Sequence, residues 1–313
     1  MYKSILVPLD GSTFAEHALP LALAIARKAG AKLHLVHVLE PLASVYSEGP
    51  AFVDLDLPQR IKARLRGYLD SVALRVRRLV PVTVTAELAE GDITEMLQTE
   101  AARTNADLVV MTTHGRGPLG RFWLGSVADE LVRVLPMPLL LVRPPDTVPD
   151  LAAEPQLKNI LIPLDGSKIA EKMVERAVEV GRLTGAGYTL LRVIKPVPPV
   201  PSPTGSASLD AEVESMLQAM DAIQEKLRKE ALTYLDGVAR PLRALGLRVE
   251  TKVVVDQQPG AAIVHEAATP AADLVALETH GRRGLSRLIL GSVADKVIRG
   301  AAVPVLVHKP KQG

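Results

Sequence analysis

The chain has 313 residues, of which 48% are hydrophobic and 23% are charged, and its formal net charge at pH 7 is +2. This balance argues against a strong electrostatic field for nucleic acid or membranes, and the absence of cysteine excludes disulfides, thiolate metal sites and cysteine nucleophiles. The length favours two domains that each bury a core, and we expect neither nucleic acid nor a membrane as a partner.

The beginning of the chain runs directly into a strand-like segment. It shows no charged leader, no long apolar core and no small-residue cleavage site. Nothing in the sequence approaches the roughly 20 apolar residues of a membrane span. We therefore expect a cytoplasmic protein.

The first half alternates between strand and helix patterns. Residues 4–9 form a short apolar run, typical of a strand buried on both faces of a parallel sheet, and a helix is predicted over 15–29. Gly30 follows where a helix of this kind should end. Further strands are predicted over 32–38, 82–88, 107–111 and 138–142, and further helices over 58–79, 91–103 and 125–135. This order predicts an α/β domain with a five-stranded, mostly parallel sheet flanked by helices.

The second half repeats the first. Residues 159–167 match 4–12 closely, and 273–294 match 107–128. The predicted boundaries are 1–144 for the first domain, 145–157 for a proline-rich linker and 158–313 for the second domain. The spacing between matched positions shows that the second half carries about eleven extra residues between its second and fourth strands. A Pro-rich insertion around 196–208 and a long helical stretch over about 209–245 lie in that interval.

Two loops in each half have the residues of a phosphate site. In an open parallel sheet, ligands bind beyond the carboxyl ends of strands where the strand order reverses. The first and fourth strands, which we expect to be neighbours, end at Asp10 and near Gly115, and Gly125-Ser126 opens the next helix. Backbone N–H groups at a helix N-terminus bind phosphate where glycine permits close approach. The alternative is that these glycines only make a tight strand-to-helix connection.

His114-Gly115, followed by nine residues and then Gly125-Ser126, resembles the universal stress protein motif G-x2-G-x9-G-[S/T]. His280-Gly281 with Gly291-Ser292 repeats it. The resemblance implies a tandem universal stress protein that acts in the stress response. It also implies two Rossmann-like domains of the adenine nucleotide alpha hydrolase type, from a family in which one branch binds ATP and another binds no nucleotide. The fifth strands of such proteins often pair domains, which implies an intra-chain pseudo-dimer and leaves a homodimer of two chains open.

The resemblance also implies a set of site residues. Asp10 and Val38 would lie near base and ribose, and the helix that starts near Gly125 would hold the phosphates. The full implied set in the first half is Pro8, Leu9, Asp10, Val38, Met111, Thr112, His114, Gly115, Gly125, Ser126 and Val127. The corresponding second set is Asp165, Val193, His280, Gly281, Gly291, Ser292 and Val293. Alternatives stay open: Asp10 and Asp165 as turn residues only, Val38 as core, and Ser126 and Ser292 as N-caps only.

The two copies depart from the motif differently. Its first glycine is replaced by Thr112 in the first half and by Glu278 in the second. Thr112 is short and uncharged. A Glu278 carboxylate that points at polyphosphate would repel it by about 1 kcal/mol if solvated and by more if desolvated. It could instead point away or pair with Arg282 or Arg283, so the sequence predicts ATP mainly in the first half and a weaker second site.

Binding is favoured over catalysis by what the motifs lack. There is no G-x4-G-K-[ST] sequence and no obvious general-base dyad. Neither half offers a second His or carboxylate at ligand spacing from His114 or His280, so we expect no metal site beyond Mg²⁺ carried with ATP. The sequence thus predicts an ATP-binding regulatory protein, with a nucleotide-free interaction protein and a slow ATPase as alternatives.

Overall fold

The computed structural model of the chain describes residues 1–41, 56–113, 124–145, 147–198, 209–268, 272–279 and 290–309. The elements of the first half are β1 (Ser4–Pro8), α1 (Thr13–Glu16), α2 (Leu19–Ala29), β2 (Lys32–Leu39), α3 (Leu57–Arg77), β3 (Val84–Glu90), α4 (Ile93–Arg103), β4 (Leu108–Thr112), α5 (Ser126–Val134) and β5 (Leu139–Val142). Those of the second half are β6 (Asn159–Pro163), α6 (Lys168–Thr184), β7 (Gly187–Ile194), α7 (Leu209–Ala244), β8 (Val249–Val255), α8 (Pro259–Ala268), β9 (Leu274–Glu278), α9 (Ser292–Gly300) and β10 (Val305–His308).

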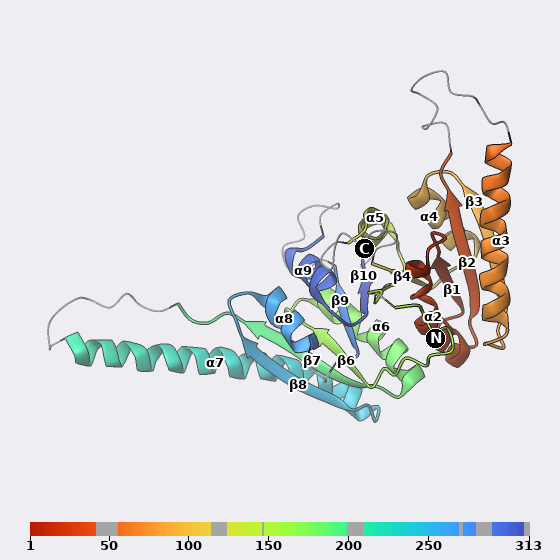
Figure 1. The fold of residues 1–313 in the computed structure, drawn as a ribbon. Helices are drawn as coiled ribbons and strands as arrows, with labels where there is room; N and C mark the ends of the chain where they lie inside the picture. The colour runs from red at the N-terminus through yellow and green to blue at the C-terminus, as the bar shows by residue number, and fades with distance from the viewer. Residues whose placement is uncertain are drawn as a thin grey trace, which may run out of the picture.

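All ten of these strands belong to one sheet, in the order β3-β2-β1-β4-β5-β10-β9-β6-β7-β8. Each half is a parallel sheet, and the expected neighbours, β1 with β4 and β6 with β9, are paired. The halves join where β5 runs antiparallel to β10, with Leu140 opposite Leu306. The predicted α/β fold is therefore confirmed, and the fifth strands pair the two halves within the chain (Figure 1).

Helices cover both faces of the sheet (Figure 1). On one face α2, α3, α6 and α7 contribute to an apolar cluster with alternate strand residues such as Ile5 and Ile160. On the other face α4, α5, α8 and α9 pack over the intervening residues such as Leu6 and Leu161. Because the central strands such as β1, β4, β9 and β10 are covered on both sides, their sequences are mostly continuous apolar runs, whereas the edge strands β3 and β8 mix apolar and polar residues.

The helix predicted over 15–29 is wrong as a single element. The structure has two helices here, α1 and α2, with a break at His17 and Ala18. Pro20, in the first turn of α2, is the reason, because its ring would clash with the carbonyl of residue 16 in a continuous helix and it has no N–H to donate. The second half has Glu175 at the equivalent position, and α6 is continuous.

The helix α7 is much longer than its counterpart in the first half. It has 36 residues, whereas α3 has 21. Only its C-terminal part packs on the sheet, where Ala231, Leu235 and Ala239 are buried. Its N-terminal part extends well beyond the edge of the sheet (Figure 1).

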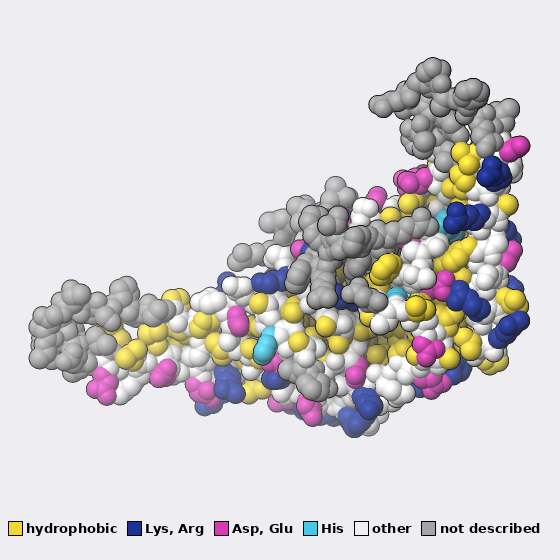
Figure 2. Space-filling view, viewed as in Figure 1, with side chains coloured by type: hydrophobic (Ala, Val, Ile, Leu, Met, Phe, Trp, Pro, Cys, Tyr) yellow, Lys and Arg dark blue, Asp and Glu magenta, His cyan; other side chains and the backbone are white. Residues whose placement is uncertain are grey.

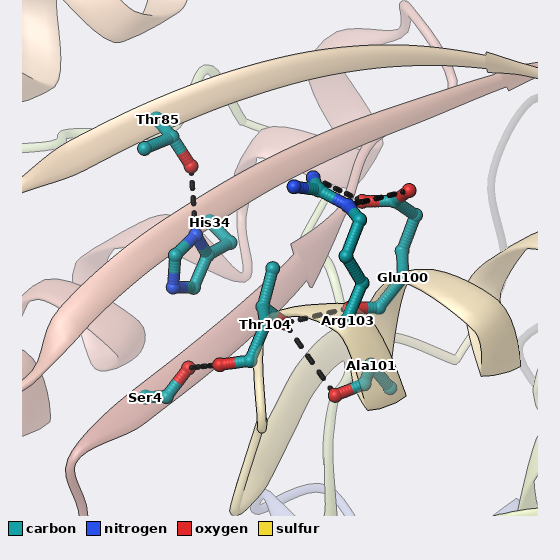
Figure 3. A network of polar contacts seen from close by, with 7 residues as sticks. All are labelled: Ser4, His34, Thr85, Glu100, Ala101, Arg103 and Thr104. Carbon is teal, nitrogen blue, oxygen red and sulfur yellow. Dashed lines mark hydrogen bonds and ion pairs between the residues drawn. The ribbon is translucent and has the colours of Figure 1, made fainter.

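The aspartate that opens each repeated stretch is structural. Asp107 accepts hydrogen bonds from the backbone N–H groups of Lys3 at 2.7 Å and Ser4 at 3.2 Å. Asp273 accepts equivalent bonds at the start of β6, at 2.8 and 2.9 Å. The Ser4 hydroxyl also donates to the Thr104 carbonyl at 2.8 Å (Figure 3). These contacts join the amino ends of neighbouring strands, at the opposite end of the sheet from the predicted site.

The same end of the sheet carries a histidine with a structural role (Figure 3). A 2.7 Å hydrogen bond joins His34 Nδ1 to the hydroxyl of Thr85 on the neighbouring strand. Nearby, Arg103 donates to both carboxylate oxygens of Glu100. Burial, followed by the charge of Arg103, lowers the pKa of His34, so the neutral imidazole is favoured here.

Candidate functional site

The predicted site lies beyond the carboxyl ends of β1 and β4. The strand β1 has β2 on one side and β4 on the other, so the chain order reverses between β1 and β4. Loops that leave two such strands diverge to opposite faces and open a crevice between them. The second half repeats this arrangement with β6, β7 and β9.

The loop after β1 is a turn organised by Asp10. Its Oδ1 accepts hydrogen bonds from the Ser12 backbone N–H at 2.8 Å and from the Ser12 hydroxyl at 2.5 Å. Gly11 has a φ of 81°, which favours glycine, and Ser12 then caps α1 by accepting from the Ala15 N–H at 3.3 Å. Asp10 therefore stabilises the turn and holds its carboxylate at the carboxyl end of β1, beside Pro8 and Leu9.

The loop after β6 is built in the same way. Asp165 Oδ1 accepts from the Ser167 N–H at 2.8 Å, Gly166 has a φ of 85°, and Ser167 caps α6 through the Ala170 N–H at 3.2 Å. The two halves thus present the same aspartate turn at the two crevices.

The helix on the far side of the first crevice begins without a side-chain cap. Gly125, with extended backbone, is the N-cap of α5, and its own N–H donates to the Thr113 carbonyl at 2.7 Å. The alternative that Ser126 is the N-cap is therefore wrong, because Ser126 is already the first helical residue. The first N–H groups of a helix, here including those of Ser126 and Val127, have no acceptor within the helix.

The second helix start explains why this position is glycine. Gly291 is the N-cap of α9, and its N–H donates to the Thr279 carbonyl at 3.0 Å. A Cβ atom on Gly291 would lie 3.0 Å from that same carbonyl oxygen, which is closer than nearly all Cβ atoms approach a neighbouring atom. Ser292 therefore follows the N-cap, as Ser126 does, and Val293 is the next helical residue, 37% exposed.

Apolar residues lie on the sheet near the carboxyl ends of β1 and β4, where the crevice is expected. Met111, in β4, is buried on the face of the sheet that α5 covers, and Val38 of β2 and Val127 of α5 pack against the same cluster. Val193, the second-half counterpart of Val38, packs in the same way. Val38 thus contributes to the core, as the alternative supposes, and it also lies toward the end of its strand that faces the crevice.

The two departures from the motif lie at one position of the sheet. Thr112, the last residue of β4, is opposite Val142 in β5. Glu278, the last residue of β9, is opposite His308 in β10. Both Thr112 and Glu278 are buried, with 5% and 7% exposure. The side chain at this position is therefore packed within the protein rather than open to solvent.

Glu278 pairs with a residue that its sequence context does not suggest. His308 Nδ1 lies 3.1 Å from Glu278 Oε1, whereas Oε2 is buried without a partner among the described residues. Burial raises the pKa of Glu278, opposed by the hydrogen bond with His308 and by the charges of Lys172 and Arg176 in α6. The carboxyl group is thus turned toward β10. Its alternative partners Arg282 and Arg283 lie outside the described residues.

A tyrosine of α7 contacts a glutamate in the first turn of α6, the helix that follows the Asp165 turn. The Tyr234 hydroxyl donates to Glu171 Oε1 at 3.2 Å, and the Arg192 guanidinium lies 5.0 Å from the Tyr234 ring centre. Burial, then the charge of and hydrogen bond to Glu171, raise the pKa of Tyr234 to about 12. In the first half the matching Glu16 forms an ion pair with Arg75 at 2.9 Å. The sequence alone gives no signal for these residues, because each pair joins helices far apart in the chain.

Several predicted residues lie outside the described part of the chain. These are His114, Gly115, His280 and Gly281, which belong to the two glycine-rich loops. Among the residues that the structure describes, no group of three or more His, Asp or Glu side chains could hold a metal ion. Within the same part of the chain, no helix has the length and apolar character needed to cross a membrane.

Both repeats match the family model described as universal stress protein, over residues 1–143 and 156–309. The chain belongs to the universal stress protein family. A universal stress protein of Mycobacterium tuberculosis is 32% identical over 206 residues, which cover 65% of this chain and 62% of that relative. The chain thus spans less than two thirds of the length of the first relatives that it matches.

A solved structure shares the fold of the whole chain. The crystal structure of a universal stress protein from Archaeoglobus fulgidus aligns with 98% of this chain and 96% of its own, with 20% identity and a TM-score of 0.66. That likeness shows the tandem fold alone. A universal stress protein solved in complex with cAMP aligns with 46% of this chain and 98% of its own, with 22% identity and a TM-score of 0.35. A nucleotide complex is thus known for that protein.

Proposed function

We propose that this universal stress protein binds ATP with Mg²⁺, mainly in the first-half crevice, and acts in the stress response as a nucleotide-dependent regulatory or binding protein. One observation carries the proposal. The uncapped start of α5 is hydrogen-bonded to Thr113, directly after β4, and β4 is the neighbour of β1, which the Asp10 turn follows. This topology supports the inference that helix N–H groups and a carboxylate flank one crevice.

The start of α5 suits a phosphate group. Its first N–H groups lack helix acceptors, and the helix dipole adds a partial positive charge there. The Ser126 hydroxyl is a further donor. The acid of the first turn, Asp129, is bound by Arg133 through both carboxylate oxygens, at 2.8 to 3.1 Å, so its negative charge is paired with a positive one.

The other wall of the crevice suits a nucleoside. A ribose carries hydroxyl groups that donate to carboxylates, and Asp10 is held in place by its own turn. Val38 and Met111 supply apolar surface beneath, where a base gains by leaving water. Because the chain has no G-x4-G-K-[ST] loop, we propose binding rather than rapid hydrolysis.

The second crevice has the same backbone frame but a different charge. Thr112 adds none to the first crevice, whereas Glu278 places a buried carboxyl group at the end of β9, directly before the loop. Its side chain is turned toward His308, so any repulsion of phosphate acts across the sheet rather than by direct contact. This makes the second site weaker than the first without closing it.

A pair of matched variants tests the proposal. Ser126→Asp and Ser292→Asp place a carboxylate in the first turn of α5 and of α9, where an acid favours the helix but repels phosphate. Calorimetric titration with ATP and Mg²⁺ should give a stoichiometry near one per chain for the wild type. Binding should be lost in Ser126→Asp at an unchanged unfolding temperature and little changed in Ser292→Asp.

Other results of these experiments would support the alternative functions. No nucleotide released from the purified protein by denaturation, together with no heat at millimolar ATP, would support the nucleotide-free interaction protein. Equal losses in the two variants would show that Glu278 does not weaken the second site. Turnover faster than about one per second, near the low end for ordinary enzymes, would support an ATPase.

A further inference from the structure

We propose that the protruding part of α7 pairs in antiparallel orientation with the same segment of a second copy of this chain. This part, residues 214–230, is called the arm. Every residue of the arm is exposed except the half-buried Met220 and Gln224, and burial begins only at Ala231. At 1.5 Å per residue the arm is about 25 Å long. Figure 1 shows it projecting away from the rest of the molecule.

The arm carries an apolar stripe with the spacing of a helix–helix interface. Met216, Met220, Ile223 and Leu227 follow one another at intervals of four, three and four residues, which places them on one face. Met216 is 46% exposed, Ile223 is 50% exposed and Leu227 is 39% exposed. Figure 2 shows hydrophobic side chains along this projecting part of the surface.

The stripe continues the face that holds α7 on its own domain. Four residues beyond Leu227 it reaches Ala231, and after a further four Leu235, which are both buried against the sheet. The face of α7 that packs on the sheet at Ala231 and Leu235 therefore continues along the arm, where the sheet no longer covers it. Helix propensity alone leaves a helix of this length marginally stable in water, so an occupant of the stripe would stabilise the arm.

The charges of the arm favour a second copy of itself in antiparallel orientation. Residues 214–224 contain Glu214 and Asp221 and no Lys or Arg, for a net charge of −2. Residues 225–230 contain three bases, Lys226, Arg228 and Lys229, and two acids, for a net charge of +1. Antiparallel copies place the acidic end of one arm beside the basic end of the other and oppose their helix dipoles. A parallel pair would place acid beside acid, and an anionic membrane would repel the acidic end.

The apolar spacing fixes the register of the pair. A two-fold axis between Asp221 and Ala222 sets Met216 of one copy opposite Leu227 of the other, and Met220 opposite Ile223. The same register brings Glu214 to the level of Lys229. Such an isologous contact uses one surface on both copies. It is small compared with a standard interface, so the association should be weak and depend on concentration.

The absence of cysteine in the chain allows a direct test of this register. Met216→Cys and Leu227→Cys, carried by chains of different size, should form the mixed disulfide on oxidation and little of either homodimer. Within one arm the two positions are about 16 Å apart, so a parallel pair would instead give both homodimers. Val148→Cys, at a position 83% exposed and off the arm, is the control for random collision.

Sedimentation velocity over a range of concentrations tests the association itself. The wild type should show a reversible monomer–dimer equilibrium that the double variant Met216→Lys/Ile223→Lys removes. Both positions are exposed, so the far-UV circular dichroism of the domains should persist. A wild type that stays monomeric at every concentration, a dimer that survives the double variant, or homodimeric disulfides would each overturn the proposal. Binding to anionic vesicles that the same variant abolishes would assign the stripe to a membrane surface instead.

Discussion

At the ends of the fourth and fifth strands, the two halves differ at both of two neighbouring residues. In the first half the last residues of the fourth and fifth strands are Thr112 and Val142, and in the second half they are Glu278 and His308. A carboxyl group buried alone would be costly, and the histidine opposite it supplies a hydrogen-bonding partner. One oxygen of Glu278 still lacks a partner among the described residues. The pair therefore compensates the burial of the acid only in part.

This partial compensation predicts how stability depends on pH. Since the folded state raises the pKa of Glu278 above its ordinary value of 4.5, the folded protein binds this proton more tightly than the unfolded chain. The stability that the protonated form contributes should be lost as the pH rises from 4.5 through the folded value. In Glu278→Gln this loss should be absent, so its unfolding free energy relative to wild type should grow with pH. Urea unfolding at several pH values measures the difference.

A matched double variant tests whether the Glu278–His308 pair is the source of this pH dependence. Glu278→Thr/His308→Val reproduces the first-half pair at the same register, and it should also remove this pH dependence. If the wild type and both variants changed in parallel across this range, Glu278 would not be the group responsible.

At the scale of elements, the two halves fill the space between a helix and its strand differently: a smaller helix residue in the second half accommodates a larger strand residue. In the first half Ala26 of α2 and Leu33 of β2 occupy positions that Gly181 of α6 and Tyr188 of β7 occupy in the second. Tyr188 is 1% exposed, and a Cβ on Gly181 would lie 2.2 Å from its hydroxyl oxygen. Glycine at 181 is thus required by the close approach of this tyrosine.

The same substitution should have opposite effects at two glycines in helices. Gly181→Ala should destabilise the protein by about 1–3 kcal/mol, the range for overpacking, because buried Tyr188 cannot move freely. Gly237→Ala, in α7, meets no atom within 4 Å and should stabilise it by about 0.5–1 kcal/mol through helix propensity. Urea unfolding measures both. An unaffected Gly181→Ala would mean that Tyr188 relocates at no cost.

Features that depend on residues close together in the chain could be predicted from the sequence, and features that depend on distant residues could not. The buried strands, their sequence along the chain and the pairing of β1 with β4 could be predicted, because continuous apolar runs and the repeat are visible in the sequence. The break before α2 is signalled by Pro20 alone, whereas the apolar majority over 15–29 predicts one continuous helix. The partner of Glu278 could not be predicted, since it depends on the register between β9 and β10. The Asp10 turn was predictable as a turn, and its role in binding stays a prediction.

At the scale of the whole molecule, one continuous sheet joins the two halves. The β5·β10 pair buries Leu140 against Leu306 at its centre. Further bonds cross the junction: Arg143 donates to the Ala301 carbonyl at 3.2 Å, and Lys309 donates to the Arg133 carbonyl at 2.5 Å. Separating the halves would expose two apolar strand edges at once. Each half is thus stabilised by an edge that the other supplies.

This shared edge predicts that the two halves unfold as one cooperative unit. The single tryptophan, Trp123, belongs to the first half by sequence, whereas Gly181 lies in the second. Gly181→Ala should therefore lower the urea midpoint of tryptophan fluorescence by about half a molar, in step with the midpoint of far-UV circular dichroism. Gly237→Ala should raise both midpoints together. A fluorescence midpoint that ignores Gly181→Ala while the circular dichroism signal splits into two transitions would show that the halves unfold separately, and the β5·β10 edge would then contribute little to the stability of either.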